Sequence, residues 1–154
     1  MMAALLLTTA CGGDSAPSLS VRWQHDGDGA RAVLPSEAVQ TAVYIQNEGS
    51  EAMKGLVLRF DHVDTGMMPF GLTVGTATRV SSRFEGAAQV WDLGTLLPGQ
   101  TMVFPMSLWF DSSTVTLEPR KVSLVISAES PDLDGQAVSN ALEVEVDTRA
   151  LVTK

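Results

Sequence analysis

Thr101 to Phe110, with the sequence TMVFPMSLWF, is the longest stretch of the chain in which bulky apolar side chains take every second position. The apolar positions are Met102, Phe104, Met106, Leu108 and Phe110. Successive side chains of a β-strand point to opposite faces, so a period of two predicts a strand with one buried face. Pro105 falls on the outward phase and cannot donate a ladder hydrogen bond, so we expect an edge position or a bulge there.

The same alternation recurs in six other segments. Their inward positions are Leu19, Val21 and Trp23; Val39, Val43 and Ile45; Leu56, Leu58 and Phe60; Trp91 and Leu93; Val122, Leu124 and Ile126; and Leu142, Val144 and Val146. Turn chemistry lies between these segments: Asn47 to Ser50 tolerates positive φ, and Pro98-Gly99 fits a type II turn. No stretch shows the periodicity of a long amphipathic helix. We therefore predict an all-β fold, an antiparallel immunoglobulin-like β-sandwich of seven or eight strands.

Length and charge narrow the possible partners. The 154 residues suit one domain, and the formal net charge is −8, with a sequence pI near 4.5. An acidic surface repels phosphate groups and anionic lipid. We therefore expect neither nucleic acid nor polybasic membrane docking.

The first residues form an apolar run, Ala3 to Ala10, that ends at Cys11, the only cysteine of the chain. Eight residues rise only about 12 Å as a helix, which is too short to cross a hydrocarbon core of roughly 30 Å. The pattern resembles a bacterial lipoprotein signal, in which cleavage leaves the cysteine at the new N-terminus and lipid is attached to its sulfur. The alternative is an apolar N-terminal strand with Cys11 as an ordinary thiol.

This reading divides the chain into four parts. Residues 1–10 are expected as a lipoprotein-type signal peptide and residues 11–17 as a flexible tether. Residues 18–148 form the sandwich and residues 149–154 a C-terminal tail. The expected location is the cell envelope, with the lipid on Cys11 in the outer membrane and the domain facing the periplasm or the exterior.

Three segments together resemble a known family of bacterial surface modules. They are Val43 to Gly49 (VYIQNEG), Val90 to Gln100 (VWDLGTLLPGQ) and Ser139 to Val144 (SNALEV). The first is similar to a strand that ends in an Asn-x-Gly turn, and the second to a Trp-x-Leu-Gly-x-Leu-x-Pro-Gly segment. In this order they resemble the repeat module called domain of unknown function eleven, and nearly as well the cell-adhesion-related domain found in bacteria, over roughly residues 36 to 148.

The resemblance implies an immunoglobulin-like sandwich without catalytic residues, used in adhesion or envelope proteins and usually repeated in tandem. A single copy here favours an accessory subunit. We therefore expect a lipid-anchored envelope module for adhesion, scaffolding or a surface assembly, bound to an unidentified envelope or surface protein, and not an enzyme. The alternative is a periplasmic accessory domain that binds a ligand or calcium.

Few residues suggest a metal site. Asp132, Asp134 and the following Gly135, with help from Glu129, could wrap calcium in a tight loop. The alternative is a solvated acidic turn, because the full calcium-loop pattern is incomplete. The two histidines, His25 and His62, have no metal-ligand spacing, so we expect no zinc and no resident cofactor.

One apolar segment stands out between two glycines. Met67, Met68, Pro69 and Phe70 follow Gly66 and precede Gly71. They could form an exposed loop tip that docks a partner, since methionine and aromatic side chains suit such surfaces. Equally, the loop could fold back and cover one open end of the sandwich.

Overall fold

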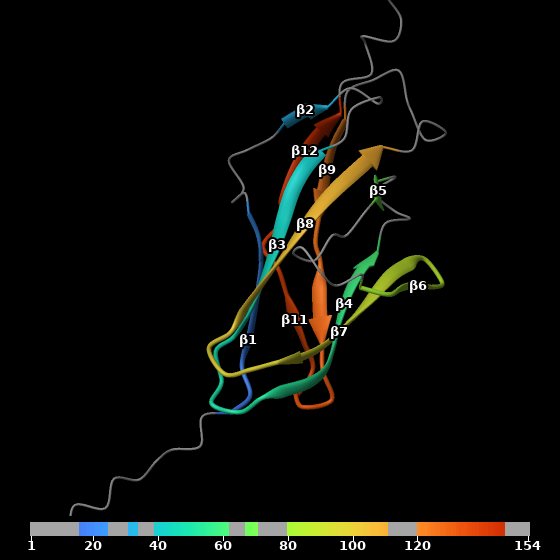
Figure 1. Ribbon diagram of the computed structural model, residues 1–154. Coiled ribbons are helices and arrows are strands. Elements are labelled where there is room, and N and C mark those ends of the chain that lie inside the picture. Colours follow the sequence, from blue (N-terminus) through green and yellow to red (C-terminus); the bar gives the residue numbers. More distant parts are fainter. Residues whose placement is uncertain are drawn as a thin grey trace, which may run out of the picture.

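A computed structural model describes residues 16–24, 31–33, 39–61, 67–70, 80–110 and 120–146. All the regular structure in these residues is β-strand (Figure 1). In chain order the strands are β1 (Leu19–Trp23), β2 (Arg31–Val33), β3 (Val39–Asn47), β4 (Met53–Asp61), β5 (Met67–Phe70), β6 (Ser82–Glu85), β7 (Ala88–Leu96), β8 (Thr101–Phe110), β9 (Arg120–Leu124), β10 (Ser127–Glu129), β11 (Gln136–Val138) and β12 (Leu142–Val146).

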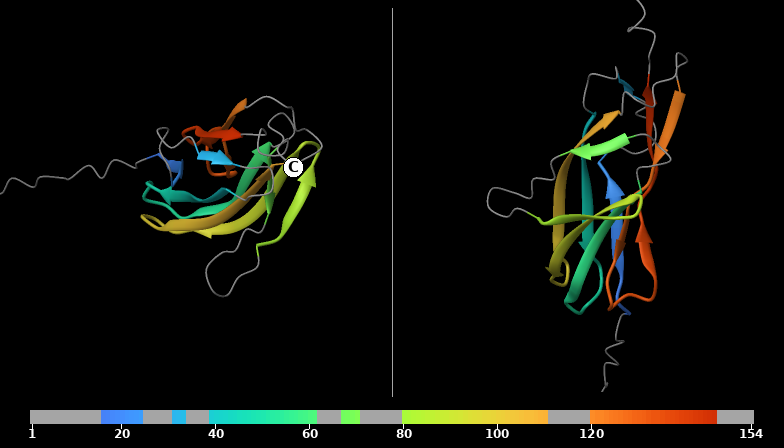
Figure 2. Two further views of the ribbon diagram at one scale, coloured as in Figure 1. Left: turned by 90° about the horizontal axis from the view of Figure 1, so that it is seen from above. Right: turned by 90° about the vertical axis from the view of Figure 1, so that its right-hand side faces the viewer.

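Two main sheets enclose the core, and Figure 2 shows them from above and from the side. The first sheet has the order β1-β3-β8-β5, and the second sheet has the order β11-β10-β4-β7-β6. A small third sheet has the order β2-β12-β9. The pairing is antiparallel in both main sheets, whereas β2 runs parallel to β12. The predicted all-β, immunoglobulin-like sandwich is confirmed.

The strands of the described residues number twelve, more than the seven or eight expected. The seven long alternating segments all form strands. The five additional strands, β2, β5, β6, β10 and β11, have only three or four residues each. A period of two cannot be recognised over so few residues, because the signal needs at least four to eight positions.

The core is built from the inward positions of both sheets. Trp23 of the first sheet meets Phe60 of the second edge-to-face, with ring centroids 6.2 Å apart and an interplanar angle of 87°. Both rings are fully buried, and Trp91 is 2% exposed, so the expected aromatic anchors lie inside. Edge-to-face contact is a favoured aromatic geometry and adds to the gain from burying the rings.

Pro105 lies where β8 forms a local edge, as the sequence predicts. Its partner in β3 is Ala42, and the register shows no shift there. On the other side, β5 pairs only with Ser107 to Phe110, so no described strand adjoins Pro105. Because proline has no N–H, its nitrogen is tolerated on this open side.

Asn47 holds together the β3–β4 and β7–β8 turns, which lie at the lower end of the molecule in Figure 1. Its Nδ2 donates to the carbonyl oxygens of Glu51 (2.8 Å) and Leu96 (3.0 Å), and its Oδ1 accepts from Gly49 N (3.0 Å). Gly99 N donates to Asn47 O at 2.9 Å. One buried side chain therefore joins the β3–β4 turn to the end of β7.

The predicted turn at Pro98-Gly99 is present. Gln100 N donates to Leu97 O at 3.0 Å, and Gly99 has a φ of 68°. Proline at the second position and glycine with positive φ at the third are the requirements of a type II turn.

The C-terminal hairpin belongs to two sheets. Its outer half pairs β9 with β12 in the third sheet, and its inner half pairs β10 with β11 in the second sheet. At the change of sheet, Ser139 N donates to Ile126 O (2.9 Å) and Ile126 N donates to Ser139 Oγ (3.1 Å). The side-chain oxygen thus replaces a backbone acceptor where the regular ladder is interrupted.

Trp23 connects β1 to this hairpin. Its backbone N donates to Asn140 Oδ1 at 2.8 Å, and its indole Nε1 donates to Leu124 O at 3.1 Å. A buried indole N–H needs such an acceptor. The end of β1 is therefore held by both the backbone and the ring of one residue.

Candidate interaction surfaces

The predicted lipid site lies outside the described residues. Cys11, the signal peptide 1–10 and most of the tether belong to residues 1–15, and His25 and His62 also lie in parts that the structure does not describe. In the described segments no helix is long and apolar enough to cross a membrane. Lipid attachment at Cys11 stays a prediction.

The segment Met67, Met68, Pro69 and Phe70 is not a loop tip. These residues form β5, which pairs antiparallel with the last four residues of β8, from Met67 opposite Phe110 to Phe70 opposite Ser107. The expectation of a loop was wrong because a long partner strand was available to pair with a segment too short to show alternation. Their side chains lie outside what the structure describes, so contact with a partner or covering of the sandwich end stays a prediction.

The acidic turn of the suggested calcium site is fastened to β4. Asp132 Oδ2 accepts from Lys54 N at 2.8 Å, and Ser130 Oγ donates to Lys54 O at 2.7 Å and accepts from Asp132 N at 3.2 Å. Glu129 and Asp134 are exposed. Within the described ranges, no three His, Cys, Asp or Glu side chains are grouped so that they could hold a metal ion. The Asp132 carboxylate thus has a backbone-binding role in this structure, and calcium binding stays a prediction.

A surface hollow of about 590 Å³ lies beside this turn. It is lined by Gly55, Val57, Glu129, Ser130, Pro131, Gly135 and Gln136. Gly55 and Gly135 both have positive φ, and a Cβ on Gly55 would lie 3.4 Å from Pro131 Cδ. Because the two glycines have no side chains, the space between β4 and the β10–β11 hairpin stays open. Its volume is in the range of small-ligand sites.

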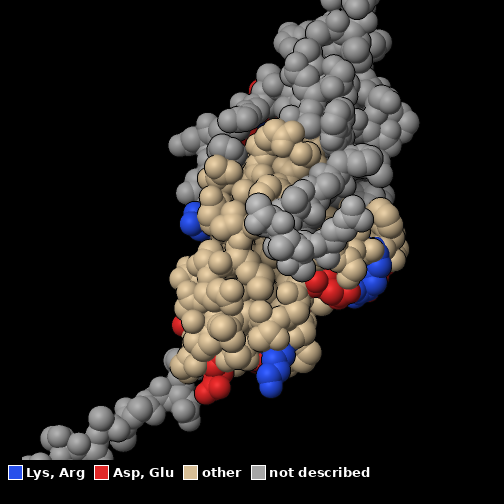
Figure 3. Space-filling model, in the orientation of Figure 1, with Lys and Arg blue, Asp and Glu red and all other residues tan. Residues whose placement is uncertain are grey.

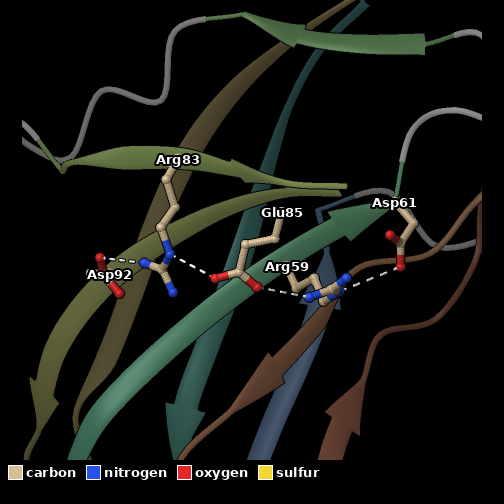
Figure 4. Close-up of polar contacts among 5 residues, drawn as sticks. All are labelled: Arg59, Asp61, Arg83, Glu85 and Asp92. Carbon is tan, nitrogen blue, oxygen red and sulfur yellow. Dashed lines mark hydrogen bonds and ion pairs between the residues drawn. The ribbon is translucent and has the colours of Figure 1, made fainter. Parts of the chain in front are cut away.

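A row of ion pairs covers the outer face of the second sheet (Figure 4). Arg83 contacts Asp92 (2.6 Å) and Glu85 (2.7 Å), and Arg59 contacts Glu85 (3.2 Å) and Asp61 (3.7 Å). The hydrogen bonds from Asp92 and then Glu85 raise the pKa of Arg83 above its ordinary value. Each of these charged groups therefore has at least one partner of opposite sign, and the three carboxylates and two arginines together carry a formal charge of −1.

The ion pairs could not be found from the sequence because they depend on strand register. Arg59 and Arg83 are the partners of Val90 on its two sides, although they are far apart in sequence. Val90 is only 1% exposed. The row therefore shields an apolar residue on an outer face, while exposed pairs of this kind add little stability.

Among the described outward positions of β1, β3 and β8, only Arg22 is charged. The outward residues in the described strands and the adjoining Gln24 are Ser20, Arg22, Gln24, Gln40, Ala42, Tyr44, Gln46, Thr101, Val103, Pro105 and Ser107. We call this set the uncharged face because Arg22 is its single charged residue. Figure 3 shows it as an area of tan surface over β3 and β8, with lysine, arginine, aspartate and glutamate at its margins.

Three residues form the central row of the uncharged face. Arg22 and Val103 are the register partners of Tyr44 on its two sides. The Arg22 guanidinium lies 4.5 Å from the centre of the Tyr44 ring, a cation–π distance. Among the described residues, no carboxylate forms an ion pair with Arg22. Val103 is 41% exposed, so the row offers an arginine, an aromatic ring and an apolar side chain to a partner.

Comparison with known proteins gives a fold and no family. The sequence matches no protein-family model and no curated protein. One solved structure with a similar fold is a pilin subunit. BcpA, the major pilin subunit of Bacillus cereus, is 13% identical with a TM-score of 0.58, over 84% of this chain and 40% of the pilin. A variant of that pilin gives the same TM-score at 12% identity, over 83% and 40%.

A second solved structure is the seventh ScaB type I cohesin from Pseudobacteroides cellulosolvens. It is 9% identical with a TM-score of 0.44, over 84% of this chain and 91% of the cohesin. The chain spans only 40% of the length of the pilin. At such identities the likeness to the pilin shows the sandwich fold alone.

Proposed function

We propose that this chain is a structural and binding module of a bacterial cell envelope, held at the outer membrane by lipid on Cys11. It acts in adhesion, scaffolding or a surface assembly through contact with another protein. The role is not catalytic. The resemblance of its turn and strand motifs to bacterial surface modules supports this proposal.

The observation that carries the proposal is the uncharged face in a chain of net charge −8. A solvated acidic protein has no need for a sheet face without carboxylates, whereas the centre of a protein–protein interface is depleted in charge and enriched in tyrosine and arginine. Tyr44 and Arg22 lie in the middle row of this face. The likeness in fold to BcpA, a major pilin subunit, supports the proposal of a role in a surface assembly.

The anchor is tested by labelling cells with palmitate and sedimenting their membranes. Wild-type protein and the matched control Ser15→Ala should carry label and sediment with membranes, and Cys11→Ala should do neither. Label or membrane sedimentation that persists in Cys11→Ala would show that the sulfur is not the lipid site.

A second candidate function is favoured by the hollow beside Glu129, namely a ligand- or calcium-binding accessory domain. A ligand that binds only the folded state raises the thermal midpoint. Millimolar calcium should then raise the midpoint of the wild type more than that of Glu129→Gln, while magnesium should not. Equal shifts in both proteins would remove Glu129 from any calcium site.

A further inference from the structure

Two hollows adjoin each other on the outer face of the second sheet. The hollow of about 590 Å³ beside Glu129 is followed by another of about 330 Å³ beside Asp61 and Val138, and Gln136 lines both. Two rows of register partners cross them: Val57, Glu129 and Gln136 in one, and Arg59, Ser127 and Val138 in the next. We call the two hollows together the hairpin groove, because the C-terminal hairpin forms one side of it.

The hairpin groove follows the direction of the strands. Its lining extends along the C-terminal hairpin from Glu129 to Ser123 through alternate residues. Six residues of extended chain span about 20 Å. The groove therefore has the length of an extended segment of about six or seven residues.

The backbone keeps the hairpin groove open at both of its ends. At one end the register of β4 with β7 shifts on both sides of Leu56, and Gly55 and Gly135 have no side chains to fill the space. At the other end β10 pairs with β4 only as far as Ser127 opposite Arg59, because β9 pairs with β12 in the third sheet. The groove therefore continues to the place where the two sheets diverge.

Three valines give the hairpin groove an apolar part. Val57 is half-buried, whereas Val125 is 43% and Val138 is 53% exposed. A partner that covers these side chains removes apolar surface from water, which favours binding. Among the described residues that line the groove there is no aromatic ring, so a planar base has no side chain on which to stack.

The charge of the hairpin groove is negative. Glu129 is exposed and forms no ion pair with the described residues. The Asp61 side chain is 67% exposed, and its carboxylate lies 3.7 Å from Arg59 Nε, beyond ordinary hydrogen-bond distance. Arg59, the one cation among the described lining residues, also contacts Glu85 at 3.2 Å. Both carboxylates of the groove can therefore accept a cation from a partner.

The charges beyond Ser123 do not reverse this sign. Lys121 lies two residues away on the same face, opposite Glu145, and Glu143 lies opposite Ser123. Two carboxylates thus accompany one lysine, in a chain whose net charge is −8.

We infer that the hairpin groove binds an extended segment of a partner polypeptide that carries two basic side chains four residues apart. Glu129 is the register partner of Val57, and Asp61 lies four residues beyond Val57 along β4, which is about 13 Å. In an extended segment, side chains four residues apart have this spacing and point to the same side. The side chain midway between them faces the valines, and the opposite charges fix the register of the contact.

This inference goes beyond the proposed function, because the hairpin groove and the uncharged face are on different sheets. The test is an NMR titration of the isotope-labelled full chain carrying Cys11→Ser, which prevents disulfide dimers. A chelator keeps calcium away from Glu129. The probe is the peptide TKTVTKT with blocked ends, whose lysines and valine lie on one side of an extended chain. It should shift the backbone amide signals of Val57, Ser127 and Gln136.

A rearranged peptide separates the fit from general attraction between opposite charges. The peptide TTVKKTT has the same composition, but its adjacent lysines point to opposite sides of an extended chain. It should bind about fivefold more weakly, because only one of its lysines can reach a carboxylate of the groove. Added salt should weaken the binding of TKTVTKT, because exposed charges are screened.

Variants of the chain test the groove itself. Asp61→Asn combined with Glu129→Gln removes both carboxylates at nearly constant shape and should weaken binding of TKTVTKT about fivefold or more. Glu48→Gln combined with Glu51→Gln is the matched control, because both residues are exposed near the β3–β4 turn; this variant should keep the affinity within about twofold. Gln136→Trp fills the middle of the groove without a change of charge and should abolish the shifts. The spectrum of each variant without peptide verifies its fold.

The inference is overturned if the two peptides bind equally, if the two double variants bind TKTVTKT equally, or if millimolar TKTVTKT shifts none of the groove signals. Groove signals that shift with protein concentration alone would identify a second copy as the occupant and would also overturn it. The same holds if the neutral oligosaccharide cellohexaose shifts these signals and the peptide does not. Lipid labelling and membrane sedimentation, which test the proposed function through Cys11, do not depend on any of these results.

Discussion

Replacing Asn47 by alanine removes the side chain that joins the turns at one end of the sandwich. The change breaks two donated hydrogen bonds, to Glu51 O and Leu96 O, and one accepted from Gly49 N. Asn47 is fully buried, so water cannot easily replace these partners. Each intramolecular hydrogen bond contributes about 1 kcal/mol net, and a buried group left without a partner costs about 1–3 kcal/mol. We expect a loss of about 3 kcal/mol in the free energy of unfolding.

Urea titration followed by tryptophan fluorescence measures this loss. With a urea dependence of about 1.5 kcal/mol per molar, the midpoint should fall by about 2 M at an unchanged slope. Gln46→Ala is the matched control, because Gln46 is adjacent and exposed, and a surface change of this kind is expected within about 0.5 kcal/mol. A loss below about 1 kcal/mol for Asn47→Ala would refute the idea that this side chain, and not the backbone ladder alone, holds the turns together.

Three other substitutions test the core and the irregular start of β4, each by urea titration. Trp91→Ala should cost about 3–5 kcal/mol, as for other large buried aromatic residues; a loss under about 1 kcal/mol would mean that the indole is dispensable. Thr41 is buried and its Oγ1 has no hydrogen-bond partner among the described atoms, so Thr41→Val should stabilise by about 1 kcal/mol, and a destabilised variant would show that the hydroxyl is satisfied. Gly55→Ala should cost about 1–2 kcal/mol because Gly55 has a φ of 58°, which an L-residue adopts only at a steric cost; an unchanged midpoint would show that β4 can relax there.

The fold could be predicted because its long strands bury only one face each. Met106 and Leu108 of β8 alternate with exposed or half-buried neighbours, and this contrast can be read directly from residue types. Neighbouring residue types also predicted three local features: the burial of Trp91, the local edge at Pro105 and the turn at Gly99. Each depends on a few neighbouring residues.

Features that depend on which strands become neighbours could not be predicted. Met67 to Phe70 looked like a loop because its partner, the end of β8, is remote in sequence. The hairpin changes sheet at Ile126 and Ser139 without a glycine or proline to mark the place. The uncharged face was also missed, although the signal was present: the outward residues of β1, β3 and β8 are almost all uncharged, but only the sheet order places them together.

The position of β1 has a mechanical consequence. Ser18 lies at the end of the sandwich where Asn47 holds the turns, since Glu48 N donates to Ser18 O at 2.9 Å, and the strand then runs to Trp23 at its far end. A pull through the preceding residues acts along β1, so the five register pairs with β3 share the load in shear instead of opening one after another. If Cys11 is the anchor, drag on a surface-attached copy would be resisted by the whole strand, with the indole of Trp23 as its final fastening.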